Sequence, residues 1–285
     1  MTRPERTSGP RPRGRRRAGA LATVVALVVL AACGGASTPA ATSAATPQPN
    51  ATVERITVAA ASDLRPAFEE LGAHFEAETG TAVTFSFGSS GQLREQIVNG
   101  APFDLFASAN VAFVDDVIEA GRGDEETKAD YALGRIVLWA SDPERVPASV
   151  DGLVDEQYRR IAIANPEHAP YGLAAKQALE SAGIYGAVAD RLVYGENISD
   201  TFRIAESGNA DVAIVALSLA VADGRRYATI PDGLHEPLHQ ALVVTSSGDQ
   251  GAAAAAFAAF VTSPAGRRVM VRYGFTLPGE PEPQS

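Results

Sequence analysis

The 285-residue chain contains one cysteine, two methionines and one tryptophan, and aromatic residues make up only 7% of it. A single cysteine cannot form a disulfide within the chain, so packing of apolar residues must stabilise the fold. The chain also lacks the G-x-S-x-G sequence of a nucleophile elbow and the G-x-x-x-x-G-K-[ST] sequence of a phosphate-binding loop. These absences argue against the common serine-hydrolase and nucleotide-binding classes.

The uncharged apolar run at residues 18–32 is too short for a membrane-spanning helix. It has 15 residues, whereas a helix that crosses a bilayer needs about 20. Five arginines at positions 11, 13, 15, 16 and 17 precede the run, and small residues end it. This order of regions is typical of a secretory signal. We therefore predict that residues 1–32 are a signal peptide and that the folded part is extracytoplasmic.

The cysteine directly follows Leu30, Ala31 and Ala32. This Leu-Ala-Ala-Cys sequence resembles the lipobox at which bacterial lipoprotein precursors are cut and acylated. The resemblance implies a lipid on Cys33 that anchors the protein to the outer face of the cell membrane. Residues 34–52 contain neither a charge nor an aromatic side chain, so we predict that residues 33–52 form a flexible, lipid-anchored tether.

The chain is strongly acidic once the predicted signal peptide is removed. Seven of its 24 Lys plus Arg and one of its 34 Asp plus Glu precede Cys33, which leaves a net charge of −16. A surface with this charge argues against nucleic acid or anionic lipid as the partner of the folded part. If the protein binds an anion, local hydrogen-bond donors must hold it, because the overall field repels it.

From residue 55 onward, short β-branched runs alternate with amphipathic segments, which is the pattern of an α/β fold with parallel strands. The predicted strands are 55–60, 82–87, 104–108, 135–140, 160–164, 192–194, 211–217 and 240–245. The predicted helices are 64–79, 90–99, 111–120, 173–182, 199–206, 250–261 and 264–273.

The α/β pattern occurs in two blocks, joined by strand-like segments near Gly134 and near His239. Two such blocks predict two lobes joined by two crossings of the chain. We assign 53–133 plus 240–279 to the first lobe and 134–239 to the second. Ligands of open α/β sheets lie beyond the carboxyl ends of the strands, so we expect a ligand cleft between the lobes.

Four predicted strand-to-helix turns carry the strongest chemical signal. They cover 60–63, 88–91, 169–172 and 196–199. The first N–H groups of a helix are unpaired and carry partial positive charge, so a pocket built from several helix starts suits a small tetrahedral dianion. Ser62 and Ser90 add hydroxyl donors. Each turn by itself is equally an ordinary helix cap, because Ser, Asn and Asp are the preferred capping residues.

Several segments together resemble the extracytoplasmic molybdate-binding proteins of ABC importers. They are AAASDL at 59–64, FGSSGQL at 87–93, GAPFDLFASA at 100–109, NPEHAPYG at 165–172 and RYGF at 272–275. The resemblance implies a two-lobed periplasmic-binding-protein fold of the doubly crossed type II. It also implies a binding protein rather than an enzyme, with molybdate or tungstate as ligand, no cofactor, and an ABC permease and its ATPase as partners.

The resemblance further implies which residues bind the anion. By position, Ser62 and Ser90 would donate from hydroxyl and backbone groups, while Tyr171 and Ile198 would donate backbone N–H. Molybdenum would be present only inside the molybdate, with no direct protein ligand. Some relatives carry a tyrosine hydroxyl where this chain has Ala216, and the Tyr171 hydroxyl is a candidate replacement.

Three alternatives stay open from the residues alone. The ligand can be sulfate, phosphate or another oxyanion, because pocket size cannot be obtained from the sequence. Asp63 is either an acid in the first turn of a helix, favoured by the helix dipole, or a cleft residue, which would favour a protonated phosphate. A serine esterase or phosphatase with Ser62 or Ser90 as nucleophile is the alternative from a different class.

Overall fold

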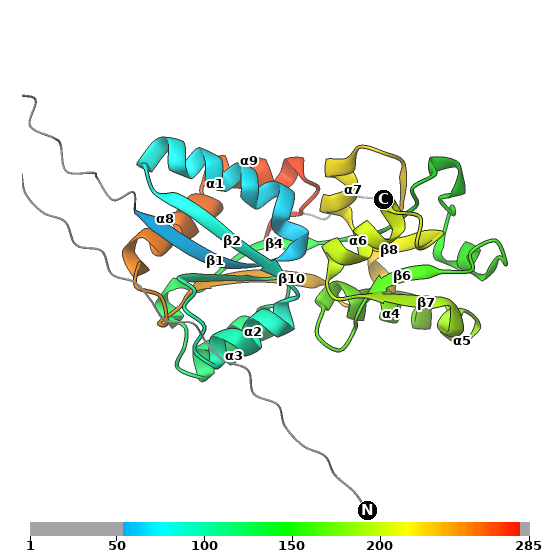
Figure 1. Cartoon of the computed structure of the whole chain (residues 1–285), viewed down its shortest axis with the longest axis horizontal. Coiled ribbons are helices and arrows are strands. Elements are labelled where there is room, and N and C mark those ends of the chain that lie inside the picture. The colour runs from blue at the N-terminus through cyan, green and yellow to red at the C-terminus, as the bar shows by residue number, and fades with distance from the viewer. Residues whose placement is uncertain (1–53, 280–285) are drawn as a thin grey trace, which may run out of the picture. The chain divides into compact units, whose positions relative to one another are not determined.

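The structure, a computed structural model, describes residues 54–279. The predicted signal peptide, Cys33 and the predicted tether therefore lie outside the described residues. Within 54–279, ten strands form two five-stranded sheets. The first sheet has the order β2-β1-β3-β10-β4 and the second β7-β6-β8-β5-β9. Figure 1 shows the two sheets in separate lobes, each with its own helices.

The strands of the first sheet are β1 (Arg55–Ala61), β2 (Ala82–Gly88), β3 (Leu105–Ser108), β4 (Ala129–Gly134) and β10 (Leu238–Val244). Those of the second are β5 (Ile136–Trp139), β6 (Ile161–Ala164), β7 (Leu192–Gly195), β8 (Val212–Ala216) and β9 (Tyr227–Thr229). In each sheet three neighbouring strands are parallel and the other two pair antiparallel to their neighbours. The two sheets thus have the same topology.

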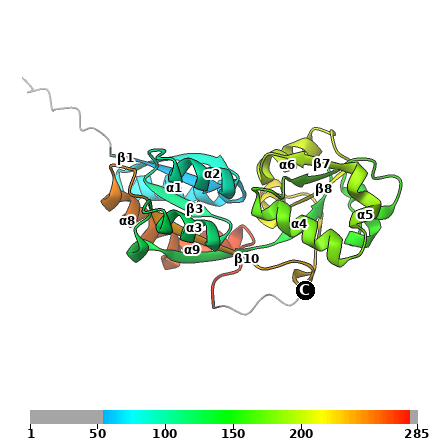
Figure 2. The ribbon, with the colours of Figure 1, turned by 90° about the horizontal axis from the view of Figure 1, so that it is seen from below.

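The chain crosses between the sheets twice. It passes from β4 to β5 through Arg135, and it returns from β9 to β10 (Figures 1 and 2). The two crossings occur where the sequence predicts them, near Gly134 and near His239. The exact lobe boundaries, 53–133 plus 240–279 and 134–239, stay a prediction.

The helices of the first lobe cover both faces of its sheet. One face carries α1 (Arg65–Thr79), α8 (Gly251–Thr262) and α9 (Pro264–Arg272), and the other carries α2 (Ser90–Val98) and α3 (Val111–Glu119). α1 buries residues spaced three or four apart, which is the helical period, and its aromatic members pack against Phe257 of α8. α1 ends at Gly80, whose φ of 78° suits glycine.

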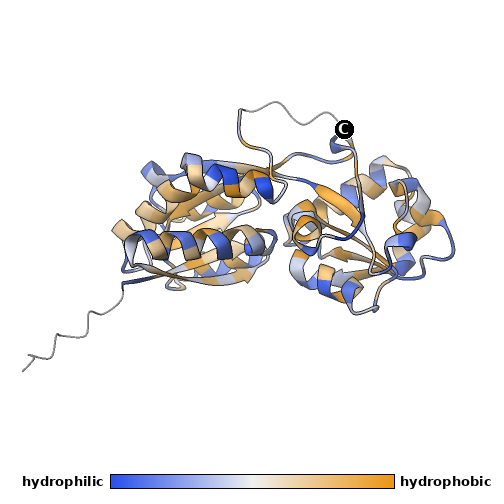
Figure 3. Ribbon diagram, turned by 90° about the horizontal axis from the view of Figure 1, so that it is seen from above, coloured by the Kyte–Doolittle hydropathy of each residue, from blue (hydrophilic) through white to orange (hydrophobic). Residues whose placement is uncertain are grey.

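The second lobe is built on the same plan. α4 (Pro170–Ser181) covers one face of its sheet, whereas α6 (Ile198–Glu206) and α7 (Leu217–Asp223) cover the other, and α5 (Tyr185–Val188) packs on α4. The central strands β6 and β8 are buried along their whole length, as expected for parallel strands covered on both faces. Figure 3 shows mainly apolar strands between helices that carry both polar and apolar residues.

The structure differs from the predicted elements at several places. The strand predicted at 211–217 ends at Ala216, and Leu217 begins α7. α4 begins at Pro170 rather than at 173, because proline fits the first position of a helix. β4, β9, α5 and α7 were not predicted. β4 and β9 are edge strands of their sheets, as are β2 and β7, which the sequence did predict.

Candidate ligand-binding site

A small cavity lies where the first turns of helices from both lobes meet. It is lined by Ala61, Ser62, Asp63, Gly88, Ser89, Ser90, Ala109, Ala169, Pro170, Tyr171 and Ile198. All four predicted binding residues are among them. The cavity volume is about 10 Å³, which is about the minimum for one water molecule. No lysine or arginine lines it.

The two serine hydroxyls are held so that their hydrogens stay available. Ser90 Oγ accepts a hydrogen bond from Ala109 N at 3.0 Å, and Ser62 Oγ accepts one from Ser199 N at 3.2 Å. In both contacts the serine oxygen is the acceptor, so the hydroxyl hydrogen of Ser62 and that of Ser90 are not used in them. Because a hydroxyl is one donor and two acceptors, each serine can donate to an acceptor in the cavity.

The second lobe contributes helix starts. Tyr171 and Ile198 occupy the first turns of α4 and α6, where N–H groups have no partner within the helix. The side chain of Asn197 accepts from Asp200 N at 3.0 Å and so caps a later residue of α6. Ile198 is 3% exposed, and its apolar side chain offers an anion nothing. Its contribution to the cavity is therefore the backbone.

Direct contacts between the lobes surround the cavity. Gly91 N donates to His168 O at 3.0 Å, and Ser89 Oγ lies 2.8 Å from His168 Nδ1. On the other side, Ser199 Oγ donates to Ser62 O at 2.8 Å. His168 and Ser199 were not predicted to join the lobes, although His168 directly precedes one predicted turn and Ser199 is the last residue of another.

A buried polar network runs from the cavity to the crossing strands. Asp63 Oδ2 accepts from Tyr171 OH at 2.9 Å and from Gln240 Nε2 at 2.8 Å, and Gln240 Oε1 accepts from Tyr131 OH at 2.9 Å. Burial raises the pKa of Asp63 from 3.8 to about 6, although these hydrogen bonds oppose the shift. Burial and the nearby Asp63 carboxyl raise the pKa of Tyr171 well above its ordinary value.

This network bears on two points that the sequence left open: the placement of Asp63 and the role of the Tyr171 hydroxyl. Asp63 lies in the first turn of the short 3-10 helix Ser62–Leu64 and is also fully buried in the lining of the cavity, so both placements that the sequence left open occur together. The Tyr171 hydroxyl donates to Asp63, so in this arrangement it does not replace the hydroxyl that is missing at Ala216. Gly134 makes room for the network, because a Cβ there would lie 2.1 Å from Tyr171 OH.

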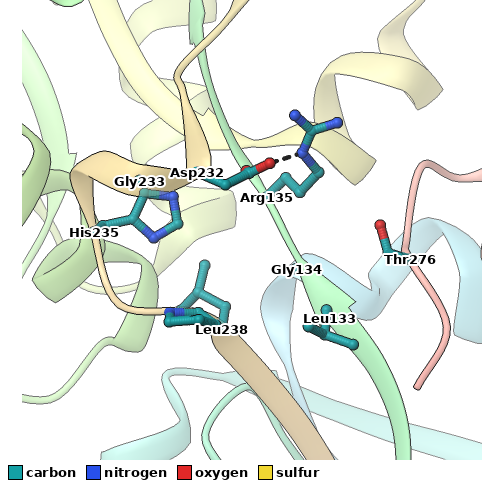
Figure 4. Close-up of a pocket in the computed structure, with 9 residues that line it drawn as sticks. Leu133, Gly134, Arg135, Asp232, Gly233, His235, Leu238 and Thr276 are labelled. Atoms are coloured by element: carbon teal, nitrogen blue, oxygen red, sulfur yellow. Dashed lines mark hydrogen bonds and ion pairs between the residues drawn. The ribbon is translucent and has the colours of Figure 1, made fainter. Parts of the chain in front are cut away.

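A larger cavity of about 310 Å³ lies beside the two crossing segments (Figure 4). Its lining includes Arg135 and Asp232, which form an ion pair with 3.1 Å between Nε and Oδ1. None of the four predicted binding residues lines it, and its only cationic head group already faces a carboxylate. The predicted binding residues thus all lie at the small cavity.

The described residues contain no group of three or more His, Cys, Asp or Glu that could hold a metal ion. Between residues 54 and 279, no helix has the length and apolar character needed to cross a membrane.

Two lobes of equal topology, a double crossing and a small cavity of neutral donors between them define a receptor for a small ligand. The chain belongs to the family of bacterial extracellular solute-binding proteins, whose family profile matches residues 56–276. The fold class predicted from the sequence, the two-lobed periplasmic-binding-protein fold, is confirmed.

Characterised relatives cover most of the chain. The molybdate-binding protein ModA of Rhodobacter capsulatus is 36% identical over 228 residues, which are 80% of this chain and 90% of that protein. ModA of Mycobacterium tuberculosis is 30% identical over 90% of this chain and 97% of its own length. The solved periplasmic molybdate-binding protein of Azotobacter vinelandii superposes with a TM-score of 0.75 at 31% identity, covering 78% of this chain and 99% of that one. The resemblance predicted from the sequence motifs is confirmed.

Proposed function

We propose that this protein is the substrate-binding component of an ABC importer that takes up molybdate and also binds tungstate. The anion would lie in the small cavity, held by the Ser62 and Ser90 hydroxyls and by backbone N–H groups of Ser62, Ser90, Tyr171 and Ile198. No cofactor takes part. The permease and ATPase of the importer would receive the anion when the lobes separate.

The observation that carries this proposal is the set of neutral donors around one cavity. Two hydroxyls with available hydrogens and the first turns of two helices converge there, and the lining includes no cationic side chain. A fully deprotonated oxyanion accepts hydrogen bonds on all its oxygens, so it matches a site made of donors. The relatives named as molybdate-binding proteins at 30–36% identity support the choice of anion.

The alternative in which Ser62 or Ser90 is a nucleophile receives no support from the contacts of these two residues. The oxygens of Ser62 and Ser90 accept from backbone N–H groups, and neither contacts a base that could remove its proton. Nucleophilic catalysis requires such a base within hydrogen-bond reach. We therefore propose binding without catalysis.

A panel of oxyanions tests the proposed ligand. A ligand at about one hundred times its dissociation constant stabilises the folded state by about 2.7 kcal/mol. In a thermal-shift assay on the purified full chain, molybdate and tungstate should therefore raise the melting temperature at low concentration. Sulfate and phosphate should need much higher concentrations for the same shift. A larger shift with sulfate or phosphate, and none with molybdate, would contradict the assignment.

The tether gives a second prediction. We propose that residues 1–32 are removed and that a lipid on Cys33 anchors the protein outside the cell membrane. Cys33→Ala should abolish incorporation of a radiolabelled fatty acid in a bacterial host, because the acyl chain needs the thiol. The same variant should bind molybdate like the parent, because Cys33 precedes the folded part. Acyl labelling of the variant at the parent level would refute the lipid anchor.

A further inference from the structure

Asp63 presents a physical conflict with the proposed ligand. Its side chain is fully buried and lines the cavity in which the oxyanion would lie. Two negative charges in contact inside a protein repel each other strongly, since the low local dielectric screens them poorly. No lysine or arginine among residues 54–279 forms an ion pair with Asp63. An ionised Asp63 would therefore oppose the binding of a dianion.

The two oxygens of this carboxyl have different surroundings. Oδ2 accepts from both Tyr171 OH and Gln240 Nε2. Oδ1 is buried and has no hydrogen-bond partner. Buried polar atoms without protein partners are rare in folded proteins, and each one calls for an explanation such as strain, an ordered water, a bound ion or a functional role. If the carboxyl is protonated, its hydrogen belongs on Oδ1, because two donors already occupy the lone pairs of Oδ2.

Burial favours the neutral form of Asp63, whereas the hydrogen bonds that its carboxyl accepts favour the ionised form. Tyr171 of α4, Gln240 of β10 and Tyr131 of β4 are the polar side chains that surround the carboxyl, and none of them carries positive charge. Ser218 of α7 donates to the backbone oxygen of Asp63 at 2.7 Å and leaves the carboxyl untouched. Burial raises the pKa of Asp63 to about 6 because it outweighs the hydrogen bonds from Gln240, from Tyr171 and from the backbone of Asp63 and Leu64, which lower the pKa.

We propose that Asp63 is protonated when the cavity is occupied and donates a hydrogen bond from Oδ1 to an oxygen of the bound oxyanion. This inference rests on the proposed function. When Asp63 is ionised in the unoccupied protein, binding takes up one proton from solvent. The proton neutralises the carboxylate, and the resulting carboxyl donates a hydrogen bond to the dianion. The oxyanion gains a third side-chain donor beside Ser62 and Ser90. The position of Asp63 in the cavity therefore does not require a protonated phosphate as ligand.

The pH dependence of binding follows from this proton. Below about pH 6 the carboxyl of the unoccupied protein is already neutral, so the affinity should level off there. Above that pH the carboxylate must first be protonated, and the affinity should fall with rising pH, approaching about tenfold per pH unit. Titration calorimetry with sodium molybdate between about pH 6 and pH 8.5 measures this slope. Repeating the titration in buffers of different ionisation enthalpy counts the protons taken up.

Asp63→Asn separates a donor role from a merely structural one. The carboxamide oxygen can accept from Tyr171 and Gln240, while its NH₂ group takes the place of Oδ1–H. The variant should bind molybdate with an affinity that stays constant with pH and that exceeds the parent's at pH 8.5 by at least tenfold. It should take up no proton. Asp124→Asn is the matched control for net charge, because Asp124 is exposed, and it should keep the parent's slope.

Each outcome decides the point. The parent could bind molybdate with no pH slope and no proton uptake, while the Asp63→Asn variant binds it more weakly. That result would overturn the role of Asp63 and leave the proposed function intact. A parent that binds inorganic phosphate more tightly than molybdate, with phosphate binding lost in Asp63→Asn, would show that Asp63 accepts a hydrogen bond instead. A parent that binds no molybdate even at about pH 6 would overturn both proposals.

Discussion

Replacing Ser62 and Ser90 together by alanine is expected to weaken molybdate binding by about two to four orders of magnitude. A hydrogen bond to a charged partner contributes about 1.5–3 kcal/mol, and about 1.4 kcal/mol corresponds to a factor of ten in affinity. The double variant loses two such bonds. Each single variant should lose about one to two orders of magnitude. Titration calorimetry of the purified full chain at about pH 6 measures all three.

The double variant needs a check on folding, because the serines also support the protein. Their loss leaves Ala109 N and Ser199 N without their acceptors, which costs about 1–3 kcal/mol for the buried N–H of Ala109 and less for the partly buried N–H of Ser199. The melting temperature should fall while the transition stays cooperative. Ser207→Ala is the control. The Ser207 hydroxyl donates to Ile204 O in an exposed contact at the end of α6, and Ser207 does not line the cavity. Parent-like affinity in the folded double variant would mean that the anion is not held at these turns.

Gly91→Ala is expected to weaken binding without weakening the fold. A Cβ at Gly91 would lie 2.6 Å from the backbone oxygen of His168 in the other lobe. Backbone atoms cannot rotate away, so the lobes must separate slightly at this contact. If the binding-competent arrangement becomes rare, the apparent affinity falls by the same factor, and we expect a loss of about 10- to 100-fold.

The stability of the Gly91→Ala variant should change in the opposite direction. Gly91 lies within α2, where alanine is up to about 1 kcal/mol more favourable than glycine. The melting temperature of the ligand-free protein should therefore hold or rise while molybdate affinity drops. Gly186→Ala is the control, because Gly186 lies in α5 and a Cβ there meets no atom within 4 Å. Equal affinity of Gly91→Ala and the parent would show that this contact between the lobes is not needed for binding.

Local sequence features were sufficient to predict most of the elements. Phe68, Leu71 and Phe75 have helical spacing, and Gly80 allows the left-handed end of α1, so the helix was predicted within one residue of its start. The buried strands were predicted from continuous apolar runs. The edge strands β4 and β9 were missed, whereas the edge strands β2 and β7 were predicted; β4 pairs only with β10 and β9 only with β5.

The four candidate binding residues were predicted from turn chemistry and from family resemblance, and the structure brings them to one cavity. Their role in holding the anion stays a prediction. The surroundings of Asp63 were not predictable, because its partners Tyr171 and Gln240 are 108 and 177 residues away. No local pattern specifies which side chains meet across such a distance.

The sequence by itself thus determined the α/β class, the two blocks, the neutral character of the donors and the family, because periodicity, helix caps and short motifs are local properties of the chain. Only the tertiary structure decided that His168 meets Ser89, that Ser199 meets Ser62, and that one oxygen of Asp63 takes two donors while the other takes none. These contacts arise where two lobes pack together, and packing depends on the shapes of both lobes at once.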